Sequence, residues 1–195
     1  MSEMKQITTP LTYEKVKELQ AGDLVSITGT IYSARDAAHK NLVESLQAGE
    51  DLPIDLVDQV IYYAGPTPAK PGKVIGSCGP TTSGRMDAYS PTLIAQGLRG
   101  MIGKGSRSKE VIEAMKEHGA VYFAAIGGAA ALIADTIKSV DIVAFPELGP
   151  EAIRRMKVES YPCIVAVDCN GNDLYKMGVE RYKDEEDEVK CNANV

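Results

Sequence analysis

The sequence contains no tryptophan and only two phenylalanines, so nine tyrosines supply most of the aromatic surface of its 195 residues. The hydrophobic core must therefore rest mainly on aliphatic side chains and methionine. No apolar run reaches the roughly 20 residues that cross a bilayer, and the first residues lack the apolar stretch of a secretory signal. These absences argue against a membrane protein and predict a cytoplasmic location.

A basic surface is also lacking, because the formal net charge is -6 at pH 7. Bulk electrostatics therefore give no support for nucleic-acid binding. The four cysteines form no Cys-x-x-Cys pair, and their spacings match no known ligand pattern. We expect no metal bound by this chain alone and, in a reducing compartment, no disulfide. An acidic protein that handles an acidic small molecule must gather its cations locally.

Strand-like and helix-like patterns alternate along the chain. β-Branched apolar alternation predicts a strand at residues 24–32, and the helical spacing that follows begins at Asp36, a good N-cap residue. The alternation that continues from there predicts an α/β fold with parallel strand pairing. The further predicted strands are residues 60–64, 73–77, 100–103, 120–126 and 141–145, and the further predicted helices are residues 86–96, 109–118, 129–137 and 150–158.

The end of the chain departs from this pattern. Asn-Gly at residues 170–171 predicts a tight hairpin turn between strands at residues 163–168 and 173–176, which makes the sheet mixed. A run of charged residues follows. We therefore expect one domain over residues 1–178 and an acidic, flexible tail over residues 179–195.

The most informative segment is Gly-Pro-Thr-Thr-Ser-Gly-Arg-Met-Asp at residues 79–87, between a predicted strand and a predicted helix. Free N–H groups at a helix start attract anions, and the Arg85 guanidinium suits a carboxylate. The alternative is a capped turn, with Thr82 or Ser83 as the N-cap and Arg85 on the surface. The loop by itself favours neither.

The same loop nearly matches a nucleotide-binding P-loop, since Gly79 and Gly84 have the required spacing. Arg85 stands where the motif needs lysine, and Met86 where it needs the Mg²⁺-binding serine or threonine. Nucleotide binding is therefore not favoured.

Other cationic side chains follow predicted strands. Arg35 and His39 lie at a strand-to-helix junction, and Lys104 follows residues 100–103. Ligands of open α/β sheets bind at such strand ends. The alternative is a hydrogen-bonded structural His39 and surface positions for Arg35 and Lys104. Together with Arg85, the two cations would suit a dianion, because unpaired charges are costly to bury.

Residues 79–87, together with the motifs at residues 35–39, 63–66 and 104–105, resemble the C-terminal domain of class I (iron–sulfur) fumarases. They are equally similar to the β subunit of L(+)-tartrate dehydratase. The resemblance covers residues 11–178. It implies a swivelling β/β/α-type domain, with a mixed sheet and flanking helices.

The resemblance also implies a partner and a cofactor. A separate α subunit would hold a [4Fe–4S] cluster through three cysteines, and its open iron would bind the substrate. This chain would be the β subunit of an α₂β₂ heterotetramer, inactive alone, that hydrates fumarate to (S)-malate. Tartrate dehydration to oxaloacetate, and a non-catalytic module that binds dicarboxylates, remain alternatives.

By the same resemblance, Thr81 is the base that removes a substrate proton, together with an acidic residue of the partner. Arg35, Arg85 and Lys104 would hold the substrate carboxylates. Cys78, just before the loop, is interpreted as a buried structural thiol rather than a cluster ligand. Further motif positions with supporting roles are His39, Gly79, Thr82 and Asp87.

Overall fold

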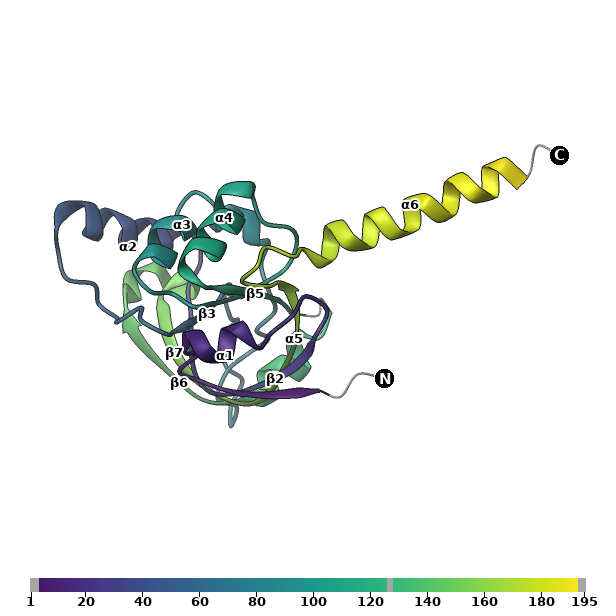
Figure 1. Ribbon diagram of the computed structural model, residues 1–195. Helices are drawn as coiled ribbons and strands as arrows, with labels where there is room; N and C mark the ends of the chain where they lie inside the picture. The colour runs from purple at the N-terminus through teal and green to yellow at the C-terminus, as the bar shows by residue number, and fades with distance from the viewer. Residues whose placement is uncertain (1–3, 126–127, 193–195) are drawn as a thin grey trace.

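The computed structural model describes residues 4–125 and 128–192, with side chains through Lys183. A seven-stranded mixed sheet forms its centre (Figure 1). Among the described residues, none of the helices is both long and apolar enough to cross a membrane. The strands are β1 (Lys5–Thr8), β2 (Leu24–Ser33), β3 (Val60–Tyr62), β4 (Gly100–Gly103), β5 (Val121–Ala124), β6 (Ile137–Ala144) and β7 (Ile153–Val167).

The sheet closes on itself through its two longest strands. β2, β3, β4 and β5 pair in parallel in that order. β7 pairs antiparallel with β5 at one end of this row and with β2 at the other. β1 extends the sheet from β2, and β6 from β7. Closure satisfies the backbone groups of both β2 and β7 on each of their edges.

Three helices cover the outside of this ring, whereas α1 and α5 contribute buried residues to the cluster inside it. Helices α2, α3 and α4 lie together on one side of the sheet, whereas α6 leaves the body (Figure 1). The α-helices are α1 (Tyr13–Lys17), α2 (Asp36–Ala48), α3 (Ser90–Ala95), α4 (Lys109–His118), α5 (Ala130–Thr136) and α6 (Leu174–Asn192), and the 3-10 helices are η1 (Ser83–Met86) and η2 (Pro146–Glu151).

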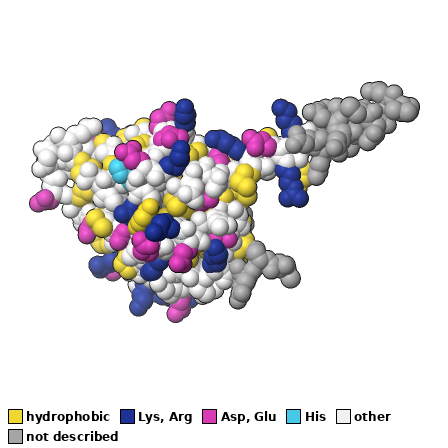
Figure 2. Space-filling model, viewed as in Figure 1, with side chains coloured by type: hydrophobic (Ala, Val, Ile, Leu, Met, Phe, Trp, Pro, Cys, Tyr) yellow, Lys and Arg dark blue, Asp and Glu magenta, His cyan; other side chains and the backbone are white. Residues whose placement is uncertain are grey.

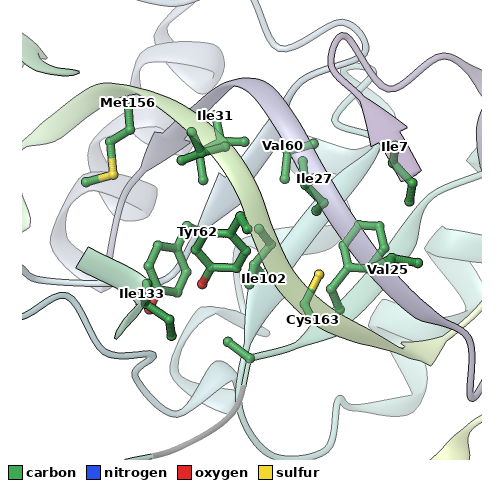
Figure 3. Close-up of a cluster of buried hydrophobic side chains, with 14 of the residues drawn as sticks. Ile7, Val25, Ile27, Ile31, Val60, Tyr62, Ile102, Ile133, Met156 and Cys163 are labelled. Carbon is green, nitrogen blue, oxygen red and sulfur yellow. The ribbon is translucent and has the colours of Figure 1, made fainter. Parts of the chain in front are cut away.

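The buried apolar side chains form two clusters, one inside the ring and one between its outer surface and the helices. The inner cluster includes Ile27, Tyr62 and Met156, which come from three different strands (Figure 3). The outer cluster includes Tyr63 together with Leu42 of α2 and residues of α3 and α4. Because side chains of an extended chain alternate between faces, neighbouring Tyr62 and Tyr63 serve different clusters.

The α/β class with a mixed sheet and flanking helices is confirmed, but some predicted elements are wrong. Residues 150–158 were expected to be helical, yet η2 ends at Glu151 and Ile153 begins the longest strand. The apolar spacing of Ile153 and Met156 also fits a helix. The segment forms a strand because it can pair with β2 on one edge and β6 on the other. Residues 73–77 form no strand.

Other boundaries differ as well, and β6 begins at Ile137 rather than residue 141. Arg35, not Asp36, is the N-cap of α2. The predicted helix at residues 86–96 is divided between η1 and α3. The predicted strand at residues 120–126 ends at Ala124, and its last predicted residue lies outside the described ones.

After Gly171 the chain turns as predicted, but it then enters α6 instead of a second hairpin strand. The Asp168 carboxylate holds this turn by accepting the N–H groups of Asn170 and Asn172, at 2.9 and 3.1 Å. Helix α6 continues to Asn192, so the expected boundary between residues 178 and 179 falls inside it.

Candidate functional site

Three strands deliver predicted site residues to one edge of the sheet. Arg35 follows the last residue of β2 by two positions, Tyr63 follows β3 and Lys104 follows β4. The three strands run parallel, so their carboxyl ends share this edge. Such an edge is where α/β sheets present polar groups to ligands.

The loop at residues 79–87 crosses the same edge. The Thr81 N–H donates to the Tyr63 carbonyl at 2.7 Å, beside a bridge between Ala64 and Pro80. On the next strand, Thr82 bridges Lys104, whose carbonyl accepts the Ser83 N–H at 2.9 Å. Backbone pairing thus brings Thr81, Thr82 and Lys104 together, although the residues come from separate segments.

Close approach of this loop depends on glycine. A Cβ at Gly103 would overlap the Ser83 hydroxyl, which is 2.8 Å from the Tyr122 hydroxyl. Gly79 packs against Ala130, since an added Cβ would lie 3.1 Å from the Ala130 Cβ. At Gly84 nothing lies within 4 Å, so this part of the loop faces open space.

The three predicted cations differ in their surroundings. Arg35 is partly buried, with Nη2 3.1 Å from Glu151 Oε1, and its buried Nε has no acceptor in the described part of the chain. Its side chain lies against Gly65, where an added Cβ would be 3.1 Å from Nη1. Arg85 and Lys104 are exposed. Within the described residues neither forms an ion pair, so both remain able to bind an anion.

His39 lies behind the edge and is completely buried. Its Nδ1 donates to the Arg35 carbonyl at 2.8 Å, and its ring meets the Tyr63 ring edge-on at a centroid distance of 5.2 Å. Burial, reinforced by the charge of Arg107, lowers the pKa of His39 to about 4. The imidazole is therefore neutral near pH 7 and, on this geometry, supports the backbone of Arg35.

The lowered pKa of His39 predicts a loss of stability in acid. Below pH 6.5 the unfolded chain takes up a proton that the folded chain refuses until about pH 4, so stability falls through this window. The difference amounts to at most about 3 kcal/mol. Urea unfolding should show a smaller fall in the free energy of unfolding between pH 7 and pH 4.5 for His39→Asn, whose amide can still donate to the Arg35 carbonyl. His118→Asn is the control, and an unchanged fall in His39→Asn would contradict the assignment.

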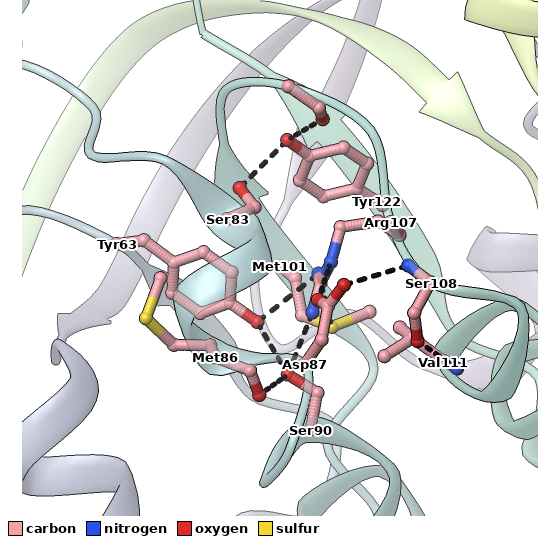
Figure 4. A network of polar contacts seen from close by, with 11 residues as sticks. Tyr63, Ser83, Met86, Asp87, Ser90, Met101, Arg107, Ser108, Val111 and Tyr122 are labelled. Carbon is pink, nitrogen blue, oxygen red and sulfur yellow. Dashed lines mark hydrogen bonds and ion pairs between the residues drawn. The ribbon is translucent and has the colours of Figure 1, made fainter.

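Asp87 is bound by two groups of the fold itself. Its carboxylate accepts the Arg107 Nε–H at 2.7 Å and the Ser108 N–H at 2.7 Å (Figure 4). Asp87 thereby ties the end of the loop to the start of α4. It is the nearest carboxylate to Thr81 along the sequence, yet its oxygens serve Arg107 and Ser108.

Arg107 was missed by the sequence analysis, although its side chain is 0% exposed. Its Nη2 donates to Ser90 at 2.8 Å, and its guanidinium lies 5.3 Å from the Tyr63 ring and 5.0 Å from the Tyr122 ring (Figure 4). Burial acts to lower the pKa of Arg107, but Tyr63 and Asp87 raise it above its ordinary value. The only signal in the sequence is its place between Lys104 and a predicted helix, which does not indicate burial.

The cysteines offer no cluster site in the described part of the chain. Cys78 is buried, burial raises the pKa of its thiol to about 12, and its carbonyl accepts the Tyr62 hydroxyl at 2.7 Å. Within residues 4–125 and 128–183, no three His, Cys, Asp or Glu side chains gather closely enough to hold a metal ion. An iron–sulfur cluster therefore does not fit the described residues of this chain.

A hollow of about 470 Å³ begins beside the edge, on the side of Gly65. Its walls come from the loop after β3 and from β6 and η2, and none of the predicted site residues lines it. Arg154 also lines it, and its guanidinium donates to the carbonyls of Gly149 and Pro150. The hollow is thus a neighbour of the candidate site, not part of it.

Comparison with known proteins places these features in a family. The model of the family described as "Fumarase C-terminus" matches residues 2–178. The chain is 47% identical over 155 residues to the aerobic class I fumarate hydratase of Escherichia coli K12, covering 78% of this chain and 28% of that protein. It is 43% identical to fumarate hydratase 2 of Leishmania major, covering 83% of this chain and 29% of that protein.

For another relative, the match covers nearly the whole protein. The chain is 42% identical over 179 residues to the proposed L(+)-tartrate dehydratase subunit beta of Methanocaldococcus jannaschii. That match covers 89% of this chain and 92% of the relative. The chain thus spans less than a third of the fumarate hydratases, but nearly all of the separate subunit.

Proposed function

The chain belongs to the fumarase C-terminus family, and on that premise we propose that it is the β subunit of a hydro-lyase that reversibly hydrates fumarate to (S)-malate. The observation that carries this proposal is the backbone pairing of residues 80–83 with the ends of β3 and β4, which joins Thr81 to Tyr63 and its neighbour Thr82 to Lys104.

The length relations support a second polypeptide. The matched residues make up 28% of the aerobic class I fumarate hydratase, whereas they make up 92% of the subunit from Methanocaldococcus jannaschii. We propose that a separate α subunit supplies the remainder and holds a [4Fe–4S] cluster, as the resemblance to class I fumarases implies. An α₂β₂ heterotetramer in the cytoplasm completes the proposal.

The cations of this chain would bind the substrate. Lys104 and Arg85 are exposed and can each take a carboxylate, and the partly buried Arg35 would be the third cation at this edge. Glu151 already neutralises part of the Arg35 charge, which holds its side chain against Gly65. Fixed cations stabilise the negative charge that builds up when a proton leaves the carbon beside a carboxylate.

Thr81 would accept that proton. A hydroxyl is a weak base and needs a carboxylate within hydrogen-bond reach. Asp87 does not serve, because Arg107 and Ser108 occupy it. We therefore assign the assisting carboxylate to the α subunit. The site is then complete only at the interface, and this chain alone is inactive.

Tartrate dehydration to oxaloacetate is the second candidate, and the near-complete coverage of the subunit from Methanocaldococcus jannaschii favours it. Both substrates are small dicarboxylates and use the same cations. A non-catalytic module that binds dicarboxylates is the third reading. It requires that Thr81→Ala leave function intact.

Reconstitution tests the proposal. The chain should be purified alone and co-expressed with a cluster-bearing chain encoded beside it, and each preparation assayed with fumarate, (S)-malate and L(+)-tartrate. We expect no turnover by the isolated chain and turnover by the complex, with the higher kcat/KM identifying the substrate. Turnover by the isolated chain would refute the two-subunit assignment, and an inactive, fully assembled complex would refute the hydro-lyase.

A further inference from the structure

One buried hydroxyl joins the two loops that carry Thr81 and Lys104. Tyr122 lies on β5, the strand next to β4, and is completely buried. Its hydroxyl is 2.8 Å from the Ser83 hydroxyl and 2.9 Å from the Gly105 carbonyl oxygen (Figure 4). Ser83 follows Thr81 by two positions, and Gly105 follows Lys104 directly. The Tyr122 hydroxyl thus contacts each loop close to its candidate site residue.

The directions of these two hydrogen bonds follow from the chemistry of the groups. A tyrosine hydroxyl carries one proton, and a carbonyl oxygen can only accept. Tyr122 therefore donates to the Gly105 carbonyl and accepts the hydroxyl proton of Ser83. Burial raises the pKa of the Tyr122 hydroxyl, so the donated proton stays in place near pH 7. A single oxygen atom satisfies both loops at once.

The surroundings hold Ser83 and Tyr122 in this arrangement. The Ser83 N–H donates to the Lys104 carbonyl, and Gly103 lacks the Cβ that would overlap the Ser83 hydroxyl. The Arg107 guanidinium lies 5.0 Å from the Tyr122 ring. On the face shown in Figure 2, basic and acidic side chains are intermingled at the surface, whereas Ser83 and Tyr122 are both buried. A hydrogen bond lost between them is therefore not replaced by one to bulk water.

We propose that Tyr122 is a positioning residue, whose hydroxyl fixes the place of Thr81 relative to Lys104 and so to the bound dicarboxylate. The inference rests on the proposed function. Removing the hydroxyl leaves both Thr81 and Lys104 in the site and alters only their mutual placement. A misplacement of about 1 Å can cost on the order of 100-fold in rate, whereas each cation can still bind a carboxylate. The loss is therefore expected in kcat and not in KM.

Tyr122→Phe in the assembled enzyme tests this positioning. We expect kcat with fumarate and with (S)-malate to fall about 10–100-fold, while KM changes by less than about twofold. Tyr161→Phe is the matched control, because it also removes a hydroxyl from a completely buried tyrosine, but one that lies on β7 in the inner cluster. It should retain wild-type kcat.

A double variant separates positioning from a general loss of structure. In the Thr81→Val background, Tyr122→Phe should lower kcat no further, because the hydroxyl that it positions is already absent. A merely structural role would lower kcat again by the same factor. Full additivity, or wild-type kcat in Tyr122→Phe, would overturn the inference and leave the proposed hydro-lyase standing.

Hydrogen exchange of the isolated chain tests the link without turnover. The backbone N–H of Ser83 should exchange about tenfold or more faster in Tyr122→Phe than in the wild-type chain or in Tyr161→Phe, because the loop opens more often. Ser83→Ala removes the same hydrogen bond from the loop side and should also speed the exchange. Unchanged exchange in both variants would overturn the link. Faster exchange together with an inactive wild-type complex would refute the hydro-lyase and, with it, the role of Tyr122 in turnover.

Discussion

Replacing Thr81 with valine in the assembled enzyme should lower kcat by about two to four orders of magnitude, the usual contribution of a positioned acid or base. Valine keeps the shape of the side chain but removes the hydroxyl. The backbone N–H that donates to the Tyr63 carbonyl is untouched, so the loop should keep its pairing with β3. KM should change little, because Arg35, Arg85 and Lys104 remain.

Steady-state kinetics with fumarate and with (S)-malate provide the measurement. Thr92→Val is the control, because Thr92 is exposed on α3 and lies outside the candidate site. It should retain wild-type kcat. If Thr81→Val also retained it, Thr81 would not be the base, and the non-catalytic reading of this loop would gain support.

Replacing Arg107 with methionine should lower the free energy of unfolding by about 3–5 kcal/mol, the cost of removing one partner from a buried ion pair. The change leaves the Asp87 carboxylate without its charged donor and removes the donor to Ser90. It also removes the cation beside the rings of Tyr63 and Tyr122. The Tyr122 hydroxyl donates to the Gly105 carbonyl, just after β4. Urea unfolding monitored by circular dichroism measures the change.

An exposed ion pair supplies the matched control. Arg155 and Asp141 are 3.3 Å apart, but their side chains are 54% and 62% exposed. Solvent screening reduces such a pair to about 0–1 kcal/mol, so Arg155→Met should hardly alter the midpoint. Similar losses in Arg107→Met and Arg155→Met would show that the buried network around Asp87 does not stabilise the fold.

Local pattern was sufficient wherever neighbouring residues decide the conformation. Helix α4 is an example, because Ser108 caps its start through a hydrogen bond to the Val111 N–H and Gly119 ends it with a φ of 70°. The loop at residues 79–87 was likewise singled out as the main family motif from its glycines, hydroxyls and arginine. Arg35 and Lys104 follow strand ends as predicted, whereas the strand expected before the loop of Arg85 does not form.

Two of the misjudged features depend on contacts between distant residues. Ile153 to Val158 could satisfy either a helix or a strand, and pairing with β2 and β6 selected the strand. Arg107 looked like a surface residue, because its partner Asp87 is twenty positions away and the tyrosines that flank it come from other segments.

By itself, the sequence determined the α/β class and the family motifs, because short-range spacing, capping and turn chemistry are written in neighbouring residues. Only the tertiary structure decided which strands close the ring, which arginine is buried and which remain exposed. Those outcomes depend on burial and on hydrogen bonds between segments, and both exist only once the chain has folded.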